Sequence, residues 1–317
     1  MKRDGSIEAD YKERARIKRR AMLGKRITFT PEEARVLLAE KPKRLRVFPR
    51  RTKATPDDSG VRIGTPELFD EADEIDISVT FTWDRAEGEA LEKQWRHIGT
   101  VQLGGPAYGD SRNGFTPGEY LKPGYVITSR GCNNRCSFCM AWRREGTLHE
   151  LPIVEGYNVL DNNLLQCSES HIRAVFAMLR RQPERARFTG GLESALLLDW
   201  HVAELATLKP KLIYLAYDEP RDYEPLRKAA EMLDEAGLVT SGHAVRAYVL
   251  CGYPDDSIES ATRRMDETCA LGIMPMAMLY RGEDGALPMR DWQRFQREWA
   301  RPSIIGAKMK GVSCEKS

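Results

Sequence analysis

Three cysteines lie close together in the chain, at Cys132, Cys136 and Cys139, in a C-x3-C-x2-C arrangement. Three thiolates on one short loop can hold three corners of a cubane cluster, and a [4Fe–4S] cluster then keeps one iron open for a small molecule. Zinc is the alternative, but a structural zinc site normally has four closed ligands, usually from paired knuckles. His149 or Cys167 could supply a fourth ligand, although neither has a second knuckle beside it. The spacing therefore favours an iron–sulfur cluster.

The same stretch resembles the C-x3-C-x-aromatic-C motif of the radical S-adenosylmethionine (radical SAM) enzymes, with Phe138 in the aromatic position. The residues Thr128–Cys132 resemble the branch that contains methylthiotransferases and cobalamin-dependent radical SAM enzymes. The resemblance covers roughly residues 45–282. It implies that the three cysteines ligate three irons and that the amine and carboxylate of S-adenosylmethionine (SAM) chelate the fourth.

A second motif follows an apolar run at 186–189, where Gly190 and Gly191 are adjacent. Two glycines allow a ligand to approach the backbone closely, and a carboxylate beside them can accept hydrogen bonds from an ammonium group. The pair resembles the GGE motif that binds the amino group of SAM, with Leu192 inserted before Glu193. A Gly-Gly pair after a strand is usually only a turn, but the cysteine loop upstream favours a cofactor site.

The resemblance suggests further contacts from later in the chain. Asp218 could take the ribose hydroxyls of SAM, Arg246 could pair with its carboxylate or with a substrate anion, and Met276 could contact adenine through its backbone. Asn162 or Asn163 could face the substrate. Turn caps and core packing are the competing interpretations of these positions, and no catalytic residue acting on the substrate is identified.

From residue 125 onward, short apolar runs alternate with amphipathic segments, which is typical of βαβ units. Strands are expected at 124–128, 157–161, 186–189, 211–217, 245–251 and 274–280, and helices at about 171–181, 193–207, 222–236 and 257–271. Six such units match the partial (β/α)6 barrel of the radical SAM family, in which the chemistry sits at the carboxyl ends of the strands. The cysteine loop follows the first expected strand.

The fold class predicted is therefore α/β, with a barrel at 116–282 preceded by a small, truncated Rossmann-like unit at 45–115. The expected elements of this unit are strands at 45–48, 75–82 and 101–103, a helix at 86–96, and a glycine turn at 104–106. The unit resembles a degenerate cobalamin-binding domain. The axial-histidine motif D-x-H-x-x-G is absent, and His97 is the only histidine before the cysteines. A structural wing is therefore preferred, and a cobalamin cofactor is doubtful.

The two ends of the chain carry less specific signals. Residues 1–44 form a basic leader, expected to be helical, whose run Lys12–Arg20 could grip phosphates. Most such charge runs are simply solvated. A further helix is expected at about 30–40. Residues 283–317 are expected to be a C-terminal helix and tail, with Met289–Trp299 closing the open side of the barrel.

Composition narrows the class of protein. The 317 residues carry a net charge of only +2, with 41% hydrophobic and 30% charged residues, which is typical of a globular chain. No run of about 18 apolar residues exists, and the basic N-terminus lacks the apolar core of a secretory signal. Seven cysteines, three of them clustered, fit a reducing compartment and a metal site. We expect a cytoplasmic location and no membrane partner.

The resemblance implies a reaction in which a flavodoxin- or ferredoxin-type donor supplies a low-potential electron. SAM is then cleaved reductively, and a 5′-deoxyadenosyl radical abstracts hydrogen from a substrate. The substrate class stays open. The Thr-Ser-Arg-Gly-Cys context and the basic leader favour a nucleic acid or nucleotide, and the wing favours a small metabolite or peptide. A non-catalytic iron–sulfur or zinc protein is the third alternative.

Overall fold

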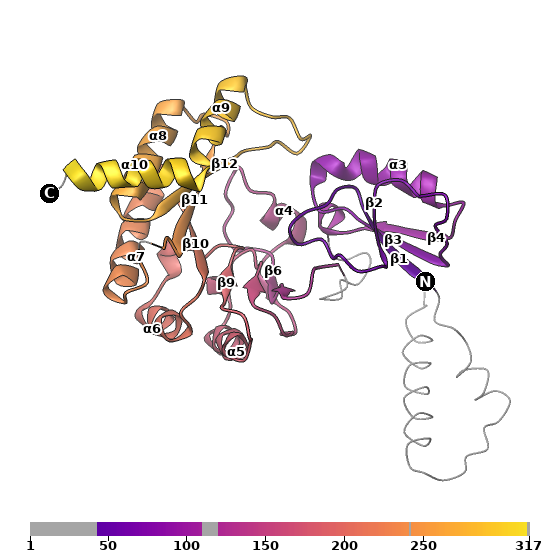
Figure 1. Cartoon of the computed structure of the whole chain (residues 1–317), viewed down its shortest axis with the longest axis horizontal. Coiled ribbons are helices and arrows are strands. Elements are labelled where there is room, and N and C mark those ends of the chain that lie inside the picture. Colours follow the sequence, from indigo (N-terminus) through magenta and orange to yellow (C-terminus); the bar gives the residue numbers. More distant parts are fainter. Residues whose placement is uncertain (1–42, 110–119, 241, 316–317) are drawn as a thin grey trace, which may run out of the picture.

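The structure, a computed structural model, contains two parallel β-sheets that lie side by side (Figure 1). It describes residues 43–109, 120–240 and 242–315. The predicted α/β class is confirmed. The basic run and the expected helix at 30–40 fall outside the described residues. None of the helices in the described ranges has the length and apolar character needed to cross a membrane.

The smaller sheet has four strands in the order β2-β1-β3-β4, all parallel. Its elements are β1 (Arg44–Phe48), β2 (Val61–Ile63), β3 (Glu74–Ser78), α3 (Arg85–Trp95) and β4 (Thr100–Gly104). The expected strand, helix, strand and glycine turn are all found, whereas the short β2 was not foreseen from the sequence. Helix α3 buries Leu91 and Trp95 against the sheet, in a core separate from that of the larger sheet.

Strand β3 departs from the alternation that its sequence suggests. Ile75 and Ile77 are buried as expected, but Asp76 and Ser78 are only 8% and 7% exposed. The hydroxyl of Tyr120 donates to Asp76 Oδ2 at 2.8 Å. The polar face of β3 is therefore covered by later parts of the chain and does not face solvent.

The larger sheet has six parallel strands in the order β12-β11-β10-β9-β8-β5. Its strands are β5 (Tyr125–Val126), β8 (Asn158–Val159), β9 (Arg187–Phe188), β10 (Leu212–Ala216), β11 (Val245–Cys251) and β12 (Met274–Leu279). Each strand lies beside the next one in the chain, as a series of βαβ units requires. The six expected strands are found, although β5, β8 and β9 are only two residues long.

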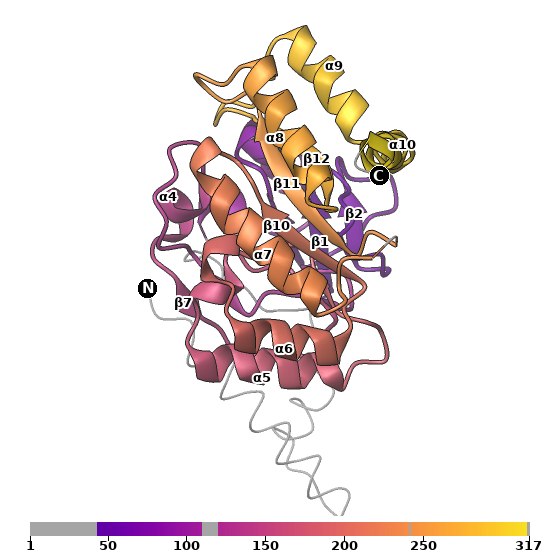
Figure 2. The same ribbon diagram turned by 90° about the vertical axis from the view of Figure 1, so that its left-hand side faces the viewer.

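The longer helices between these strands are α5 (Glu169–Arg180), α6 (Asp199–Leu208), α7 (Tyr223–Glu235) and α8 (Ile258–Ala270). Figure 2 shows them on one side of the sheet, with the small sheet behind it on the other side. Helix α6 begins later than expected because a short 3-10 turn, Ser194–Leu196, follows Glu193. One face of the sheet is thus left for the small unit and the loops.

Two helices complete the chain. Helix α9 (Arg290–Trp299) was expected, and its aromatic stripe of Trp292, Phe295 and Trp299 is buried, as the spacing predicts. It contacts β12 at the edge of the sheet. A further helix, α10 (Pro302–Glu315), follows where sequence analysis foresaw only a tail, and it contacts α8 and β12.

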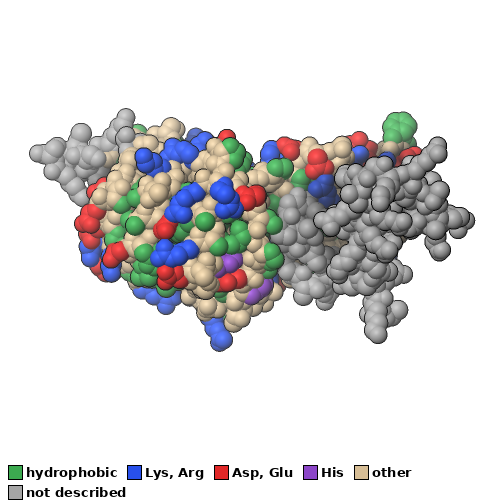
Figure 3. All heavy atoms as spheres, turned by 90° about the horizontal axis from the view of Figure 1, so that it is seen from below, with side chains coloured by type: hydrophobic (Ala, Val, Ile, Leu, Met, Phe, Trp, Pro, Cys, Tyr) green, Lys and Arg blue, Asp and Glu red, His purple; other side chains and the backbone are tan. Residues whose placement is uncertain are grey.

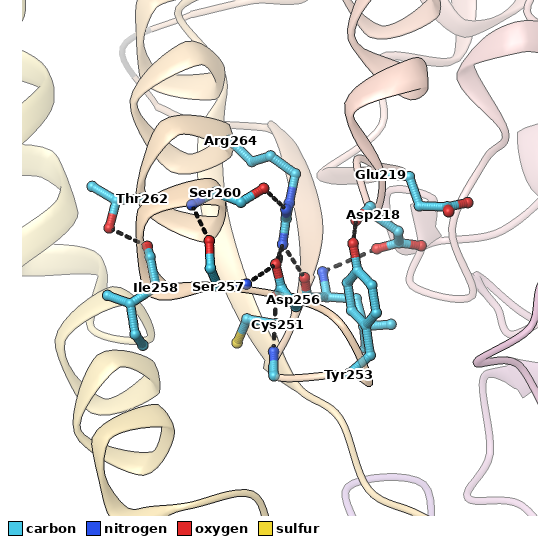
Figure 4. A network of polar contacts seen from close by, with 12 residues as sticks. Asp218, Glu219, Cys251, Tyr253, Asp256, Ser257, Ile258, Ser260, Thr262 and Arg264 are labelled. Atoms are coloured by element: carbon cyan, nitrogen blue, oxygen red, sulfur yellow. Dashed lines mark hydrogen bonds and ion pairs between the residues drawn. The ribbon is translucent and has the colours of Figure 1, made fainter.

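A buried ion pair fixes the connection from β11 to α8 (Figure 4). Arg264 Nη2 lies 3.0 Å from Asp256 Oδ2, and neither side chain has any exposure. Arg264 also donates to the carbonyl of Leu250 at 3.0 Å, and Asp256 accepts from the amide of Gly252 at 2.9 Å. Removing one partner from such a pair leaves the other charge buried and unpaired.

We therefore expect Arg264→Met to lower the free energy of unfolding by about 3–5 kcal/mol, as measured by urea denaturation. The control is Arg227→Met on α7, where the guanidinium pairs with Glu224 at 3.0 Å but is 39% exposed. That change is expected to cost less than about 1 kcal/mol. Equal losses in the two variants would contradict the importance given to the buried pair.

Candidate iron–sulfur centre and its surroundings

The cysteine loop is closed at its base by a short antiparallel pair, β6 (Ser129–Arg130) and β7 (His149–Glu150). Gly131 follows β6 with φ of 75°, and an added Cβ would lie 2.3 Å from the carbonyl oxygen of Thr147. A side chain does not fit there, because both the backbone conformation and the neighbouring carbonyl exclude it. The two ends of the loop are thus held together just before the first cysteine.

Hydrogen bonds within the loop order the three cysteines. The amide of Cys139 donates to the carbonyl of Cys136 at 3.2 Å, and Trp142 Nε1 donates to the same carbonyl at 3.0 Å. Trp142 belongs to α4 (Ala141–Glu145), the short helix that ends the loop. All three cysteines are free thiols with partial exposure. The loop therefore presents them on one ordered turn.

The electrostatic surroundings of the thiols disfavour bare thiolates. Burial raises the pKa of Cys136 to about 11 and also raises the pKa of Cys139, and the charge of Asp218 adds to both shifts. Because thiolates and not thiols bind metals, loading the site must release protons. A positively charged iron centre would offset the penalty that burial imposes.

Among the described residues, no three His, Cys, Asp or Glu side chains converge as they would around one metal ion.

Asp161 joins the end of β8 to the segment that enters the cysteine loop. Its carboxylate is 1% exposed and accepts from the amide of Thr128 at 2.6 Å, the hydroxyl of Thr128 at 2.5 Å and the hydroxyl of Ser129 at 2.9 Å. Burial raises the pKa of Asp161, and these donors partly offset that rise. The carboxylate thereby fixes the entry to the loop.

Gly190 and Gly191 follow β9 and play different structural roles. A Cβ at Gly190 would lie 2.2 Å from the carbonyl oxygen of Asp161, so only glycine allows the ends of β8 and β9 to approach this closely. Gly191 has φ of 96°, and the nearest atom to a built Cβ is 4.0 Å away. The second glycine therefore leaves open space beside the backbone, as a ligand-binding turn requires.

Glu193 lies beside the cysteine loop despite the inserted residue. Leu192 is buried in the core, and Glu193 Oε2 accepts from Asn163 Nδ2 at 2.5 Å and from Gln166 Nε2 at 3.2 Å. Asn163 Nδ2 also lies 4.0 Å from Cys132 Sγ. The other carboxylate oxygen, Oε1, makes no hydrogen bond with the described residues. It can accept from an ammonium group.

Asn163 and Gln166 tie this carboxylate to the loop. Gln166 Oε1 accepts from the amide of Asn133 at 2.7 Å, and Gln166 Nε2 donates to Asn134 Oδ1 at 3.1 Å. Sequence analysis considered Asn163 only as a possible substrate contact and did not single out Gln166. No motif marks a glutamine in a 3-10 turn as a bridge between two loops.

Asp218 follows β10 and stays near the cysteines. Its Oδ1 accepts from the amide of Leu250 at 3.0 Å, and burial raises its pKa to about 6. Its carbonyl accepts from the hydroxyl of Tyr253 at 3.2 Å (Figure 4). The ring of Tyr253 lies 5.4 Å, between centroids, from that of Phe138 in the cysteine loop. Phe138 and Asp218 therefore belong to one neighbourhood.

Arg246 and Met276 lie apart from this neighbourhood along their strands. Arg246 is the second residue of β11, five residues before the strand end at Cys251, or roughly 16 Å at the usual rise. Its Nε donates to the carbonyl of His243 at 3.1 Å. Met276 lies midway along β12, where its sulfur accepts from the hydroxyl of Tyr214 at 3.6 Å. Their suggested SAM contacts gain no support from these positions.

A cavity of about 390 Å³ opens between the two sheets. Phe48, Ser78 and Gly104, at the carboxyl ends of β1, β3 and β4, line one side. The other side is lined by residues that follow β5, β8 and β9 and by the end of the cysteine loop, namely Ile127, Leu160, Asn162, Thr189, Gly190, Arg130, Arg144 and Glu145. The carboxyl ends of both parallel sheets thus face one space, where ligands of open α/β sheets bind.

The chain resembles a known protein in its structure. No model of a protein family matches the chain. No curated protein matches it in sequence. Among solved structures, it is similar to the radical S-adenosylmethionine methyltransferase TsrM from Kitasatospora setae, determined with cobalamin and a [4Fe–4S] cluster bound. The TM-score is 0.54 at 12% identity over 75% of each chain. The predicted resemblance to radical SAM enzymes is therefore confirmed at the level of the fold.

Asp161→Ala is expected to weaken the hold on the cysteine loop, because three donors lose their buried acceptor. The free energy of unfolding should fall by about 2–3 kcal/mol, and a reconstituted cluster should lose iron to a chelator several-fold faster than in the unaltered protein. Absorbance of the iron–chelator complex measures the rate. The exposed Asp234→Ala serves as the control, and unchanged iron loss in Asp161→Ala would contradict the role given to this carboxylate.

Proposed function

We propose that this chain is a radical SAM enzyme whose six-stranded sheet is a partial (β/α)6 barrel. One observation carries the proposal: Glu193, from a motif 54 residues after Cys139, is held beside the cysteine loop with one carboxylate oxygen available. Two motifs that are distant in the sequence are thus brought together as binding of SAM beside a cluster requires. The fold shared with TsrM supports the same conclusion.

In this proposal Cys132, Cys136 and Cys139 hold a [4Fe–4S] cluster. Glu193 accepts hydrogen bonds from the ammonium group of SAM. The open space beside Gly191 allows SAM to approach the backbone. When bound, the cluster and SAM supply reductive C5′–S cleavage and a 5′-deoxyadenosyl radical. The chain orients SAM and substrate and keeps water out. Asp218 is the candidate for the ribose hydroxyls, and Phe138 packs beside the cluster.

An external donor of the flavodoxin or ferredoxin type would supply the electron, and the low potential it requires fits a reducing compartment such as the cytoplasm. We include no cobalamin in the proposal. His97 is exposed at the end of α3 and is not among the residues lining the cavity between the sheets. That cavity lacks the histidine that the D-x-H-x-x-G motif would have supplied.

Small molecules are favoured over nucleic acids as substrates. Figure 3 shows positive and negative side chains interspersed on the underside of the larger domain, without a continuous basic stripe. Arg173 on α5, for example, forms ion pairs with Glu169 and Glu204, at 2.8 and 3.3 Å. The cavity between the sheets offers an enclosed space of the size that small ligands occupy.

Cys136→Ala is expected to abolish the brown cluster formed on anaerobic reconstitution, and with it the release of 5′-deoxyadenosine after addition of dithionite and SAM. Cys269→Ala, which alters a buried thiol remote from the loop in sequence, should retain both. Iron content and chromatography of the nucleoside are the measurements. Full iron and activity in Cys136→Ala would refute the centre.

Glu193→Gln is expected to weaken SAM binding by about tenfold, because a charge-assisted hydrogen bond to the ammonium group is lost. Equilibrium dialysis of labelled SAM against the reconstituted protein measures the affinity, and iron content should not change. Glu204→Gln on α6 is the matched control. SAM affinity that is the same in the two variants would remove Glu193 from the proposed site.

A further inference from the structure

The cavity between the two sheets has the makeup of a small-molecule site. Its volume of about 390 Å³ lies within the usual range of roughly 300–1,000 Å³ for such sites. Its walls are largely apolar and come from both units, through Phe48, Ala54, Ile77, Phe81, Pro106, Leu121, Ile127 and Leu160. An apolar body that enters the cavity would therefore contact apolar side chains from both units.

The lining includes polar side-chain atoms that are buried without a hydrogen-bond partner in the described part of the chain. Among them are Nε of Arg144, a donor, and Oδ1 of Asn162, an acceptor. Buried polar groups are nearly always hydrogen-bonded, so each such exception calls for a partner beyond the described residues. A ligand with one acceptor and one donor would satisfy both.

Among the charged residues that line the cavity, Arg144 has no ion-pair partner in the described part of the chain. Arg130 Nη1 lies 3.3 Å from Glu145 Oε1, and Asp76 Oδ2 lies 3.4 Å from Arg44 Nε. Arg144 forms no ion pair with the carboxylates of the described residues. Arg144 is half-buried and its Nε is fully buried. A guanidinium in this position can form a charge-assisted hydrogen bond with an anion, so the cavity is electrostatically suited to one.

The position of these groups connects the cavity to the cysteine loop. Arg144 belongs to α4, which ends that loop, and Asn162 precedes Asn163, whose amide donates to Glu193. Gly190, from the proposed SAM-binding turn, lines the same cavity. A molecule in the cavity would therefore lie next to the site at which SAM is proposed to bind.

We propose that this cavity binds the substrate, a small molecule with an apolar body, an acidic group paired with Arg144 and a hydrogen-bond donor directed at Asn162. The inference rests on the proposed function for the identity of the ligand as substrate. It gives the small N-terminal unit a specific role, which is to supply one wall of the substrate cavity. A nucleic acid and a corrin are the competing occupants.

The test uses 8-anilinonaphthalene-1-sulfonate, which combines an aromatic body, an anion and an N–H donor, and its uncharged counterpart N-phenyl-1-naphthylamine. Fluorescence titration of the full-length reconstituted protein should give one sulfonate probe per chain. Arg144→Gln is expected to weaken binding of the sulfonate by about tenfold while changing the affinity for the neutral probe less than about twofold.

Two control variants separate this site from general surface binding. Arg143→Gln alters the exposed neighbour, whose guanidinium lies over the Trp142 ring at 5.1 Å, and should leave both affinities unchanged. Ala54→Phe fills part of the cavity and should weaken both probes, with circular dichroism as the check on folding. Equal effects of Arg143→Gln and Arg144→Gln would overturn the proposal, as would stoichiometric retention of hydroxocobalamin with displacement of the probe.

Repeating the titration on Cys136→Ala distinguishes this inference from the proposed function. Arg144-dependent binding that persists without a cluster supports the cavity, whether or not SAM is cleaved. Release of 5′-deoxyadenosine by a protein whose probe binding does not depend on Arg144 would overturn the cavity proposal alone.

Discussion

The buried carboxylate of Asp161 is the constraint on which the candidate centre depends. It has almost no exposure, and the donors that satisfy it all come from Thr128 and Ser129, directly before the cysteine loop. Gly190 lies against its carbonyl so closely that no side chain is tolerated. One residue at the end of β8 thus fixes both the loop before it and the glycine turn after it, and these two segments supply the proposed ligands of the cluster and of SAM.

The cysteine loop contributes residues both to the candidate cluster site and to the cavity between the sheets. Its first part presents the thiols, and its last turn extends Arg144 and Glu145 to the cavity between the sheets. The pairing of β6 and β7 closes its base. In the proposed function, this one segment would therefore connect the place where a radical forms to the place where an amphipathic acid binds.

The turn after β11 borders the candidate site, and a buried ion pair fixes it. This turn brings Tyr253 against Phe138. The buried pair of Arg264 and Asp256 stabilises the turn, because Asp256 accepts a hydrogen bond from the amide of Gly252. Such a pair contributes little net stability relative to an apolar replacement. We interpret it as a means of placing the Tyr253 ring, whose hydroxyl reaches the carbonyl of Asp218.

The sequence by itself determined the elements and the first ligands. Hydrophobic periodicity is local, so it located all six strands of the large sheet, and the spacing of the cysteines on one loop needs no tertiary information. The polar face of β3 and the helix α10 were not foreseen, because burial of Asp76 and docking of α10 depend on surfaces made by distant residues. Only the tertiary structure decided that Glu193 is linked to the cysteine loop through Asn163 and Gln166 despite an inserted leucine, and that Arg144 and Asn162 line one cavity. These facts arise from long-range packing, which no local pattern encodes.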